Sequence, residues 1–314
     1  MTIIEVSIII INYNTWNLLA SCIDSIQEHF EGVLHEIIVV DNASSDGSVE
    51  KIRENFPDVR LITNHENMGF AKANNQGAKV AHGEFLFLLN SDTLLTGPGL
   101  RGALDFMRGN DVAMLGPKIL NEDGSLQPSF QVVNTLNRQL LRIASMVLRL
   151  NKISRQSKPE SKPREVGFLL GAAMLINVRA VREVGLFDTQ FFFNGEERDL
   201  CLRFLKAGKR IVHYPDWEII HYGGGDAGRS PFHIVNWVKS TIKLSRKHGG
   251  AWQEWSATFL FSVLLLSNAA SRLARFVWSR DKDQKALALM NYRIFLWHIG
   301  LSDEKNALKK PERD

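Results

Sequence analysis

A run of five apolar residues, Phe85–Leu89, ends directly in the polar tripeptide Asn90-Ser91-Asp92. Such a run is typical of a strand that is buried on both faces, as in a parallel sheet. Open α/β sheets bind ligands beyond the carboxyl ends of their strands, and the tripeptide lies at such an end. A carboxylate there suits Mg²⁺ or Mn²⁺ that bridges a diphosphate. The same residue types are also common in turns after strands, so the tripeptide alone leaves a plain turn open.

The first two thirds of the chain alternate apolar runs with helix-like segments. The apolar runs are Val6–Ile11, Ile37–Val40, Arg60–Ile62, Phe85–Leu89, Val112–Leu115 and Leu169–Ile176. This alternation predicts βαβ units and an α/β fold with a mostly parallel central sheet flanked by helices. Past about residue 226 the alternation stops and the pattern becomes helical. We therefore expect one domain at 1–226 and a helical C-terminal region at 227–314.

Composition and charge narrow the class of protein. The net charge of +4 is too small to indicate a nucleic-acid partner. Cys22 and Cys201 lie in apolar helical patterns without metal-type spacing, so we expect small core residues in a reducing compartment. The N-terminus enters a strand almost at once, without a basic stretch and an apolar signal core. We therefore expect the folded body of the protein in the cytosol.

Two further strands also end in polar residues. The first strand ends in Asn12-Tyr13-Asn14, and the second ends at Asp41. An acid at such a position can accept a hydrogen bond from a nucleotide ring N–H or a ribose hydroxyl, and we assign this role to Asp41. Its alternative role is to cap the helix near Ser48, a position that Asp46 fits better.

A glycine lies at the start of a third helical segment. In Asn67-Met68-Gly69-Phe70, Gly69 allows a close approach of backbone to a ligand, and Asn74 follows one turn later. The sequence contains neither G-x-G-x-x-G nor G-x-x-x-x-G-K, so neither of these nucleotide fingerprints supports the assignment.

These blocks together resemble family 2 glycosyltransferases of the GT-A fold, which is Rossmann-like. The matching blocks are Val6–Asn14, Glu36–Gly47, Asn67–Asn75, Leu88–Asp92, Gly171–Ile176, Gly185–Asp188, Gly195–Arg203 and His221–Gly225. Within the family, the chain is most similar to rhamnosyltransferase-like members of bacterial cell-wall and O-antigen assembly. The resemblance implies a nucleotide-binding half at about 1–95 and an acceptor and catalytic half at about 96–226.

The resemblance also implies an activity: metal-dependent, inverting transfer of a sugar from a nucleotide-diphosphate donor to a glycan or polyprenyl-diphosphate-linked acceptor. L-Rhamnose from dTDP-rhamnose is the first expectation, and UDP-sugars are the next. Asn90-Ser91-Asp92 stands where the family carries a D-x-D-type metal motif, so Asp92 would be the main ligand of Mg²⁺ or Mn²⁺. His221 stands where the family places a second, histidine ligand, although a histidine at a strand end can also be structural.

The expected donor-binding residues follow from these positions. They are Asn12, Tyr13, Asn14, Asp41, Asn67, Gly69, Asn74, Asn90, Ser91 and Arg229. Arg229 would neutralise phosphate of the departing nucleotide, and its alternative is a solvated loop cation.

Inverting transfer needs a general base near the acceptor hydroxyl. The candidates are Glu196, Glu197 and Asp199 in the first turn of a helix, where acids also stabilise the helix dipole without any catalytic duty. A helical wheel places Glu197 on the buried face, at the lip of the expected cleft, and Asp199 nearly opposite, beside Arg203. The resemblance agrees, since the family reads Glu-Asp-x-Asp here and its second acid acts as the base. We therefore assign the base to Glu197, with Glu196 and Asp199 in possible supporting roles.

Two apolar segments suggest a membrane. The segment 134–152 has a wide apolar face opposite Arg138, Arg142, Arg149 and Lys152, which is typical of a helix on anionic lipid or of an ordinary packed helix. The segment 255–271 contains no charge, and Trp278 and two arginines follow it. We expect an interfacial or dimer-forming helix first, a buried helix second and a transmembrane helix last. The predicted location is therefore peripheral, on the inner face of the plasma membrane, with contacts through 134–152 and 255–278.

Two other functions fit an α/β nucleotide fold. A sugar nucleotidyltransferase would open with a Gly-rich loop that carries Arg and Lys, whereas strand one here ends in Asn-Tyr-Asn. A nucleotide-sugar-binding protein without transferase activity would not need acids at both Asp92 and Glu197.

Overall fold

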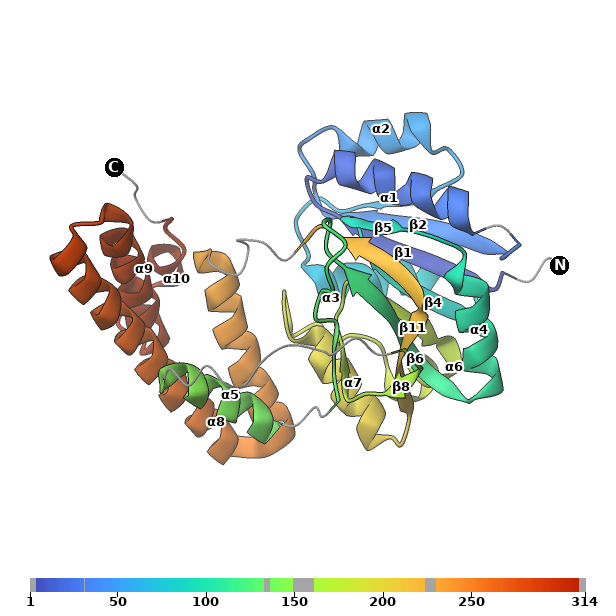
Figure 1. The fold of residues 1–314 in the computed structure, drawn as a ribbon. Coiled ribbons are helices and arrows are strands. Elements are labelled where there is room, and N and C mark those ends of the chain that lie inside the picture. The colour runs from blue at the N-terminus through green and yellow to red at the C-terminus, as the bar shows by residue number, and fades with distance from the viewer. Residues whose placement is uncertain (1–3, 31, 133–135, 149–160, 224–229, 311–314) are drawn as a thin grey trace. The chain divides into compact units, whose positions relative to one another are not determined.

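The computed structural model describes residues 4–30, 32–132, 136–148, 161–223 and 230–310. They form two compact units (Figure 1). The α/β unit contains the described residues up to 132 and 161–223, and the helical unit contains 136–148 and 230–310.

The α/β unit is built on one mixed sheet (Figure 1). In spatial order its strands are β3 (Arg60–Thr63), β2 (His35–Asp41), β1 (Val6–Asn12), β4 (Phe85–Asn90), β10 (Ala173–Asn177), β6 (Val112–Leu120), β11 (Arg210–His221) and β5 (Thr93–Leu95). A short β8 (Arg164–Glu165) also pairs with β11. Among the described strands, β1, β2, β3, β4, β6 and β11 run in one direction, and β5, β8 and β10 run against them. The predicted α/β class with a mostly parallel sheet is confirmed.

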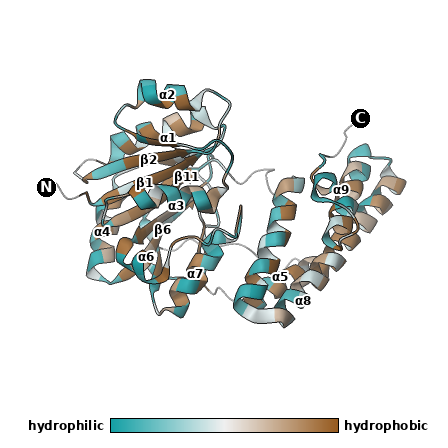
Figure 2. Cartoon of the chain, turned by 180° about the vertical axis from the view of Figure 1, so that it is seen from behind, coloured by the Kyte–Doolittle hydropathy of each residue, from teal (hydrophilic) through white to brown (hydrophobic). Residues whose placement is uncertain are grey.

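Helices cover both faces of the sheet. They are α1 (Trp16–His29), α2 (Ser48–Asn55) and α4 (Gly99–Gly109) on one face, and α3 (Phe70–Val80), α6 (Val178–Val184) and α7 (Glu196–Lys206) on the other. Successive residues of β4 point to opposite faces, with Phe85, Phe87 and Leu89 in one core cluster and Leu86 and Leu88 in the other. This explains why Phe85–Leu89 is apolar throughout rather than alternating. In Figure 2 the central strands are largely hydrophobic, whereas the covering helices carry both residue classes.

One predicted strand is divided in the structure. The run Leu169–Ile176 forms β9 (Phe168–Leu169), a turn at Gly171, and β10, which is antiparallel to β4 and β6. β9 pairs instead with β7 (Phe130–Gln131) in a separate two-stranded sheet. The two halves of the run have different partners, and apolar periodicity carries no information about partners or direction.

The helical unit contains α5 (Leu136–Val147), α8 (Pro231–Ser279), α9 (Lys282–His298) and α10 (Glu304–Ala307). A non-helical residue, Gly250, kinks α8. α5 packs on α8 through Ile143, which is buried with Val238, Phe261 and Leu264. The predicted division at residue 226 did not allow for this grouping, because α5 comes from the middle of the sequence of the α/β unit.

Both cysteines are buried core residues without a disulfide, as predicted. Burial raises the pKa of each thiol to about 12, so neither is a reactive thiolate near neutral pH.

Candidate active site

The carboxyl ends of β1, β2 and β4 meet at one edge of the sheet. Asn12 is paired in register with Asp41, and Ile11 with Asn90. The Asn12 Nδ2 donates to Asp41 Oδ2 at 2.7 Å, and the backbone N–H of Ser44 donates to Asp41 Oδ1 at 2.9 Å. Both oxygens of Asp41 are thus engaged, and its side chain is almost completely buried. The carboxylate therefore holds the side chain of Asn12 and the loop after β2 in place at this edge.

The loops at this edge carry the other residues predicted in the first half. Tyr13 is half exposed, and the exposed Asn14, at φ 56°, accepts from the N–H of Ser45 at 2.7 Å. Ser91 Oγ lies 2.9 Å from the hydroxyl of Thr15. Asp46, rather than Asp41, accepts from the N–H of Ser48 at the start of α2. Asp41 therefore belongs to the strand edge and not to the helix cap.

The Gly69 turn contacts the protein itself. Gly69 has φ +80°, and a Cβ there would lie 2.6 Å from the carbonyl oxygen of Phe192. Asn67 Oδ1 accepts from the Gly69 N–H at 2.9 Å, and the buried Asn74 donates to the carbonyl of Phe70 at 3.0 Å. The N–H of Phe70 also donates to the carbonyl of Phe192 at 2.9 Å, so the start of α3 is bonded to the loop that precedes α7. The close approach predicted from Gly69 is thus made to the protein's own backbone.

Asp92 and His221 lie side by side at the same sheet edge. Asp92 Oδ1 is 3.3 Å from His221 Nε2, and Asn90 Nδ2 is 3.4 Å from that same nitrogen. The backbone N–H of Tyr222 donates to the carbonyl of Asp92 at 2.9 Å, which ties the ends of β4 and β11 together. A Cβ on Gly223 would lie 2.6 Å from Asp92 Oδ2 and 2.8 Å from His221 Nε2. The glycine therefore keeps a space open in front of both side chains.

Gln127, which the sequence interpretation missed, holds His221 from behind. Its Nε2 donates to Asn121 Oδ1 at 2.9 Å and to the backbone carbonyls of His221 and Gly223 at 3.3 and 2.9 Å. Its Oε1 must then be the acceptor that lies 2.7 Å from His221 Nδ1. Nδ1 of His221 is thereby engaged by Gln127, and Nε2 is the ring nitrogen that faces Asp92.

Glu197 joins this edge through a short chain of contacts. A Cβ on Gly171 would lie 3.6 Å from Glu197 Cβ, so the Glu197 side chain rests on the Gly171 turn. The carbonyl of the next residue, Ala172, accepts from the backbone N–H of Asn90 at 2.9 Å. The half-buried Glu197 side chain accepts from the N–H of Gly195 at 3.0 Å. The acids at 92 and 197 are therefore linked through β4 and the Gly171 turn.

The other two acids of α7 differ from the wheel prediction in part. The predicted ion pair is confirmed, with Asp199 Oδ2 2.7 Å from Arg203 Nε. However, Asp199 is fully buried, although the wheel placed it opposite the core. The reason is that Arg203 also donates to the carbonyls of Val184 and Gly185, so the end of α6 covers this side of α7.

Glu196 is a buried acid with an incomplete set of partners. It is 5% exposed, and among the described residues its Oε2 has no hydrogen-bond partner. Burial, and after it the neighbouring Glu197 carboxylate, raise the pKa of Glu196 well above its ordinary range. Glu196 therefore keeps its proton to higher pH than an ordinary glutamate does.

Two predicted features lie partly or wholly outside this description. Arg229 and residues 134–135 and 149–152 of the segment 134–152 are not among the described residues. Within those that are described, no group of three or more His, Cys, Asp or Glu side chains gathers as a metal cluster. Asp92 and His221 are a two-residue donor set.

Comparisons with known proteins identify the family of the chain. The family model for glycosyl transferase family 2 matches residues 7–185. An N-acetylglucosaminyl-diphospho-decaprenol L-rhamnosyltransferase of Mycobacterium tuberculosis is 30% identical over 236 residues, which cover 69% of this chain and 76% of the relative. A rhamnosyltransferase of Escherichia coli is 34% identical over a shorter stretch, 33% of this chain and 40% of its own.

Solved structures support the fold. GalNAc-T7, solved with UDP, GalNAc and Mn²⁺, matches with a TM-score of 0.59 at 18% identity, over 85% of this chain and 52% of its own. Residues 1–349 of Staphylococcus aureus TarS match with a TM-score of 0.52 at 16% identity, over 94% of this chain and 81% of theirs. The GT-A architecture is therefore shared. The chain belongs to glycosyl transferase family 2, and within that family it is rhamnosyltransferase-like.

Proposed function

We propose that the protein transfers a sugar, with inversion, from a nucleotide-diphosphate donor to a hydroxyl of a glycan or polyprenyl-diphosphate-linked acceptor. The donor proposed first is dTDP-L-rhamnose, because the relative from M. tuberculosis is named as an L-rhamnosyltransferase that acts on a decaprenyl-diphosphate-linked sugar. The observation that carries the proposal is the linkage of Asp92, His221 and Glu197 through the ends of β4 and β11 and the Gly171 turn.

Glu197 serves as the general base. Its carboxylate takes the proton of the acceptor hydroxyl while that oxygen bonds to the anomeric carbon, and the bond to the donor phosphate breaks with its electron pair leaving on the diphosphate. The raised pKa of Glu196 favours this role, because Glu196 gives up its proton less readily than an ordinary glutamate and so places less negative charge beside Glu197. The buried Asn12–Asp41 pair fixes the strand edge on which the nucleoside rests.

The residues present fit a divalent metal. His221 Nε2 lies 3.3 Å from the Asp92 carboxylate, and an imidazole nitrogen and a carboxylate oxygen are both side-chain donors that divalent metal ions accept. Gly223 leaves room beside both, and oxygens of the donor diphosphate would complete the ligand set. When bound, Mg²⁺ or Mn²⁺ would stabilise the charge that develops on the leaving diphosphate.

The location that follows is peripheral, on the cytoplasmic face of the plasma membrane, where polyprenyl-linked acceptors are found. One described helix, Pro231–Ser279, is long and apolar enough to cross a membrane by length and composition alone.

A panel of nucleoside diphosphates and diphospho-sugars with Mn²⁺, measured by thermal shift, tests the donor proposal. dTDP and dTDP-rhamnose should raise the melting temperature by mass action, more than UDP, GDP or ADP do. Hydrolysis of the matching nucleotide sugar then separates a transferase from a silent binding protein. If no nucleotide shifts the melting temperature, the proposal is wrong.

Gly223→Ala is expected to weaken Mn²⁺ binding by about tenfold or more, because loss of support around a metal site commonly costs that much. The new Cβ would meet Asp92 Oδ2 and His221 Nε2 well inside contact distance. Gly223 is not among the residues with positive φ, so alanine adds no backbone strain. Electron paramagnetic resonance titration with Mn²⁺ measures the effect. Gly97→Ala, where a Cβ meets nothing within 4 Å, is the matched control and should bind Mn²⁺ like the wild type.

A further inference from the structure

The second half of α8 carries an exposed stripe that is entirely apolar. Its members recur at steps of three or four residues, so they lie along one side of the helix. They are Trp252, Trp255, Phe259, Val263, Leu266, Ala270, Leu273 and Val277. All of them except Val263 and Ala270 have side chains that are between 47% and 73% exposed. The 25 steps from residue 252 to residue 277 span about 37 Å at 1.5 Å per residue. A solvent-facing helix side is normally polar, so this stripe is unusual.

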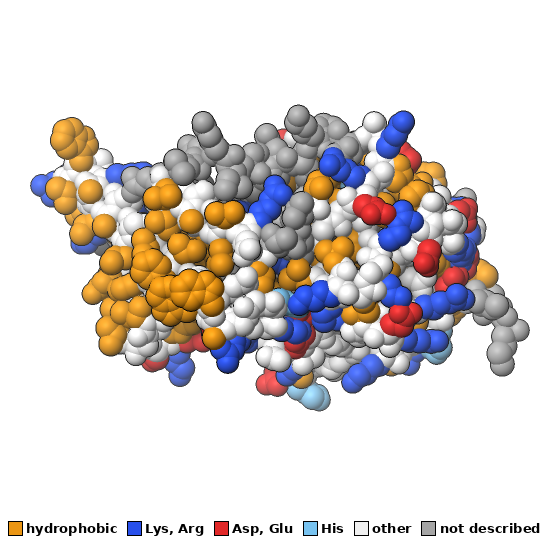
Figure 3. Space-filling model, turned by 90° about the horizontal axis from the view of Figure 1, so that it is seen from below, with side chains coloured by type: hydrophobic (Ala, Val, Ile, Leu, Met, Phe, Trp, Pro, Cys, Tyr) orange, Lys and Arg blue, Asp and Glu red, His pale blue; other side chains and the backbone are white. Residues whose placement is uncertain are grey.

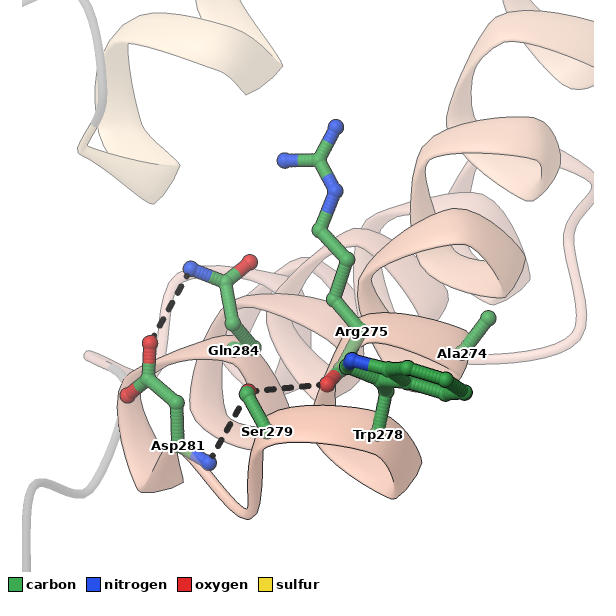
Figure 4. Close-up of a pocket in the computed structure, with 6 residues that line it drawn as sticks. All are labelled: Ala274, Arg275, Trp278, Ser279, Asp281 and Gln284. Carbon is green, nitrogen blue, oxygen red and sulfur yellow. Dashed lines mark hydrogen bonds between the residues drawn. The ribbon is translucent and has the colours of Figure 1, made fainter.

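The first three members form an aromatic ladder. The rings of Trp252 and Trp255 stack with centroids 5.2 Å apart, and those of Trp255 and Phe259 stack at 5.7 Å. Figure 3 shows hydrophobic side chains gathered over the helical unit. Trp278, 93% exposed, continues the apolar surface beside Arg275 at the α8–α9 turn (Figure 4). Trp and Arg are residues that gather at the boundary between water and lipid.

The opposite side of the same helix segment packs against other helices of the helical unit. Ala257, Phe261, Leu264, Leu265 and Ala269 are buried, and they pack within the helical unit against α5 and α9. Only 28% of the most apolar window of α8 is buried. A helix with one side packed on its own unit and the other apolar and exposed fits an orientation in the plane of an interface rather than across it.

The helical unit also carries an excess of positive charge. Residues 230–310 contain 13 Lys and Arg against five Asp and Glu. Out of totals of 38 and 34, the rest of the chain keeps 25 Lys and Arg against 29 Asp and Glu. α5 adds Arg138 and Arg142 and no acid. The small net charge of the whole chain thus conceals a strongly cationic helical unit, which is complementary to an anionic surface.

We propose that this stripe docks the helical unit on an anionic phospholipid bilayer, with the aromatic ladder in the headgroup region and cations of the helical unit on the lipid phosphates. The inference rests on the helical unit alone. Its test contains no donor or acceptor, so failure of this proposal and failure of the transferase proposal are distinguishable.

The test is sedimentation of the full chain with vesicles of phosphatidylcholine alone or mixed with phosphatidylglycerol. The wild type should pellet with the anionic vesicles, less so as salt rises, and much less with phosphatidylcholine alone. The variant Trp252→Ser/Trp255→Ser/Phe259→Ser should lower the partition coefficient by about tenfold or more, because burying even one Trp side chain is worth that much. Leu34→Ser is the matched control, since Leu34 is 51% exposed on the α/β unit, and it should bind like the wild type.

Circular dichroism melting shows whether the triple variant is folded, which is expected because the three side chains are exposed. The proposal is overturned if the wild type stays in the supernatant, or if the folded triple variant pellets as well as the wild type. It is also overturned if alkaline carbonate fails to release the protein from cell membranes, because the helix then crosses the bilayer. A dimer that the triple variant converts to a monomer, with unchanged vesicle binding, would instead assign the stripe to a second copy of the chain.

Discussion

Glu197→Gln is expected to lower kcat by about 10²- to 10⁴-fold, the range that a positioned general base contributes. Glutamine keeps the shape of the side chain on the Gly171 turn but cannot take the proton of the acceptor hydroxyl. Donor binding should be unchanged, because the strand ends at Asp41 and Asp92 are not altered. Steady-state transfer assays give kcat, and the thermal shift by dTDP with Mn²⁺ checks donor binding.

The neighbouring acids supply controls for this prediction. Burial raises the pKa of Glu196, so Glu196→Gln keeps the shape of a side chain whose surroundings disfavour a charge and should retain most of the activity. Asp199→Asn should instead lower the melting temperature, since it removes the buried partner of Arg203. Near-full activity of Glu197→Gln would show that the base lies elsewhere.

Asp92→Ala is expected to lower kcat/KM by about 10²-fold or more, because metal charge stabilisation at a leaving group is worth several kcal/mol. The change removes the carboxylate next to His221 and leaves the turn intact, since the Tyr222 N–H bonds to the backbone carbonyl of residue 92. The Mn²⁺-dependent part of the dTDP thermal shift should disappear with the activity. Asp58→Ala, an exposed acid in the turn before β3, is the control. A variant at 92 that keeps the full Mn²⁺-dependent shift would contradict the assignment.

Much of the fold could be predicted because the apolar pattern within a single strand shows which of its faces are buried. Phe85–Leu89 is apolar throughout because both faces of β4 are covered, and the polar residues after β1, β2 and β4 mark one sheet edge because those strands are parallel. Strand direction is not local information, so the antiparallel β10 was not predicted.

In the site, too, contacts within one helix could be predicted and contacts between distant elements could not. The ion pair of Asp199 with Arg203 was predictable because both lie on one helix at a fixed spacing, whereas the burial of that pair depends on the end of α6. Gln127 gave no signal, because its contact with His221 spans 94 residues and a glutamine in a loop has no characteristic pattern.

The path of the chain through α5 has a practical consequence. The backbone leaves the α/β unit before α5, returns after it, and leaves again after Gly223. A truncation after residue 223 would delete α8, against which Ile143 of α5 is buried, and it would present that side chain to water. To express the α/β unit as an isolated, soluble fragment, the segment between β7 and β8 must therefore be excised as well as the C-terminal helices.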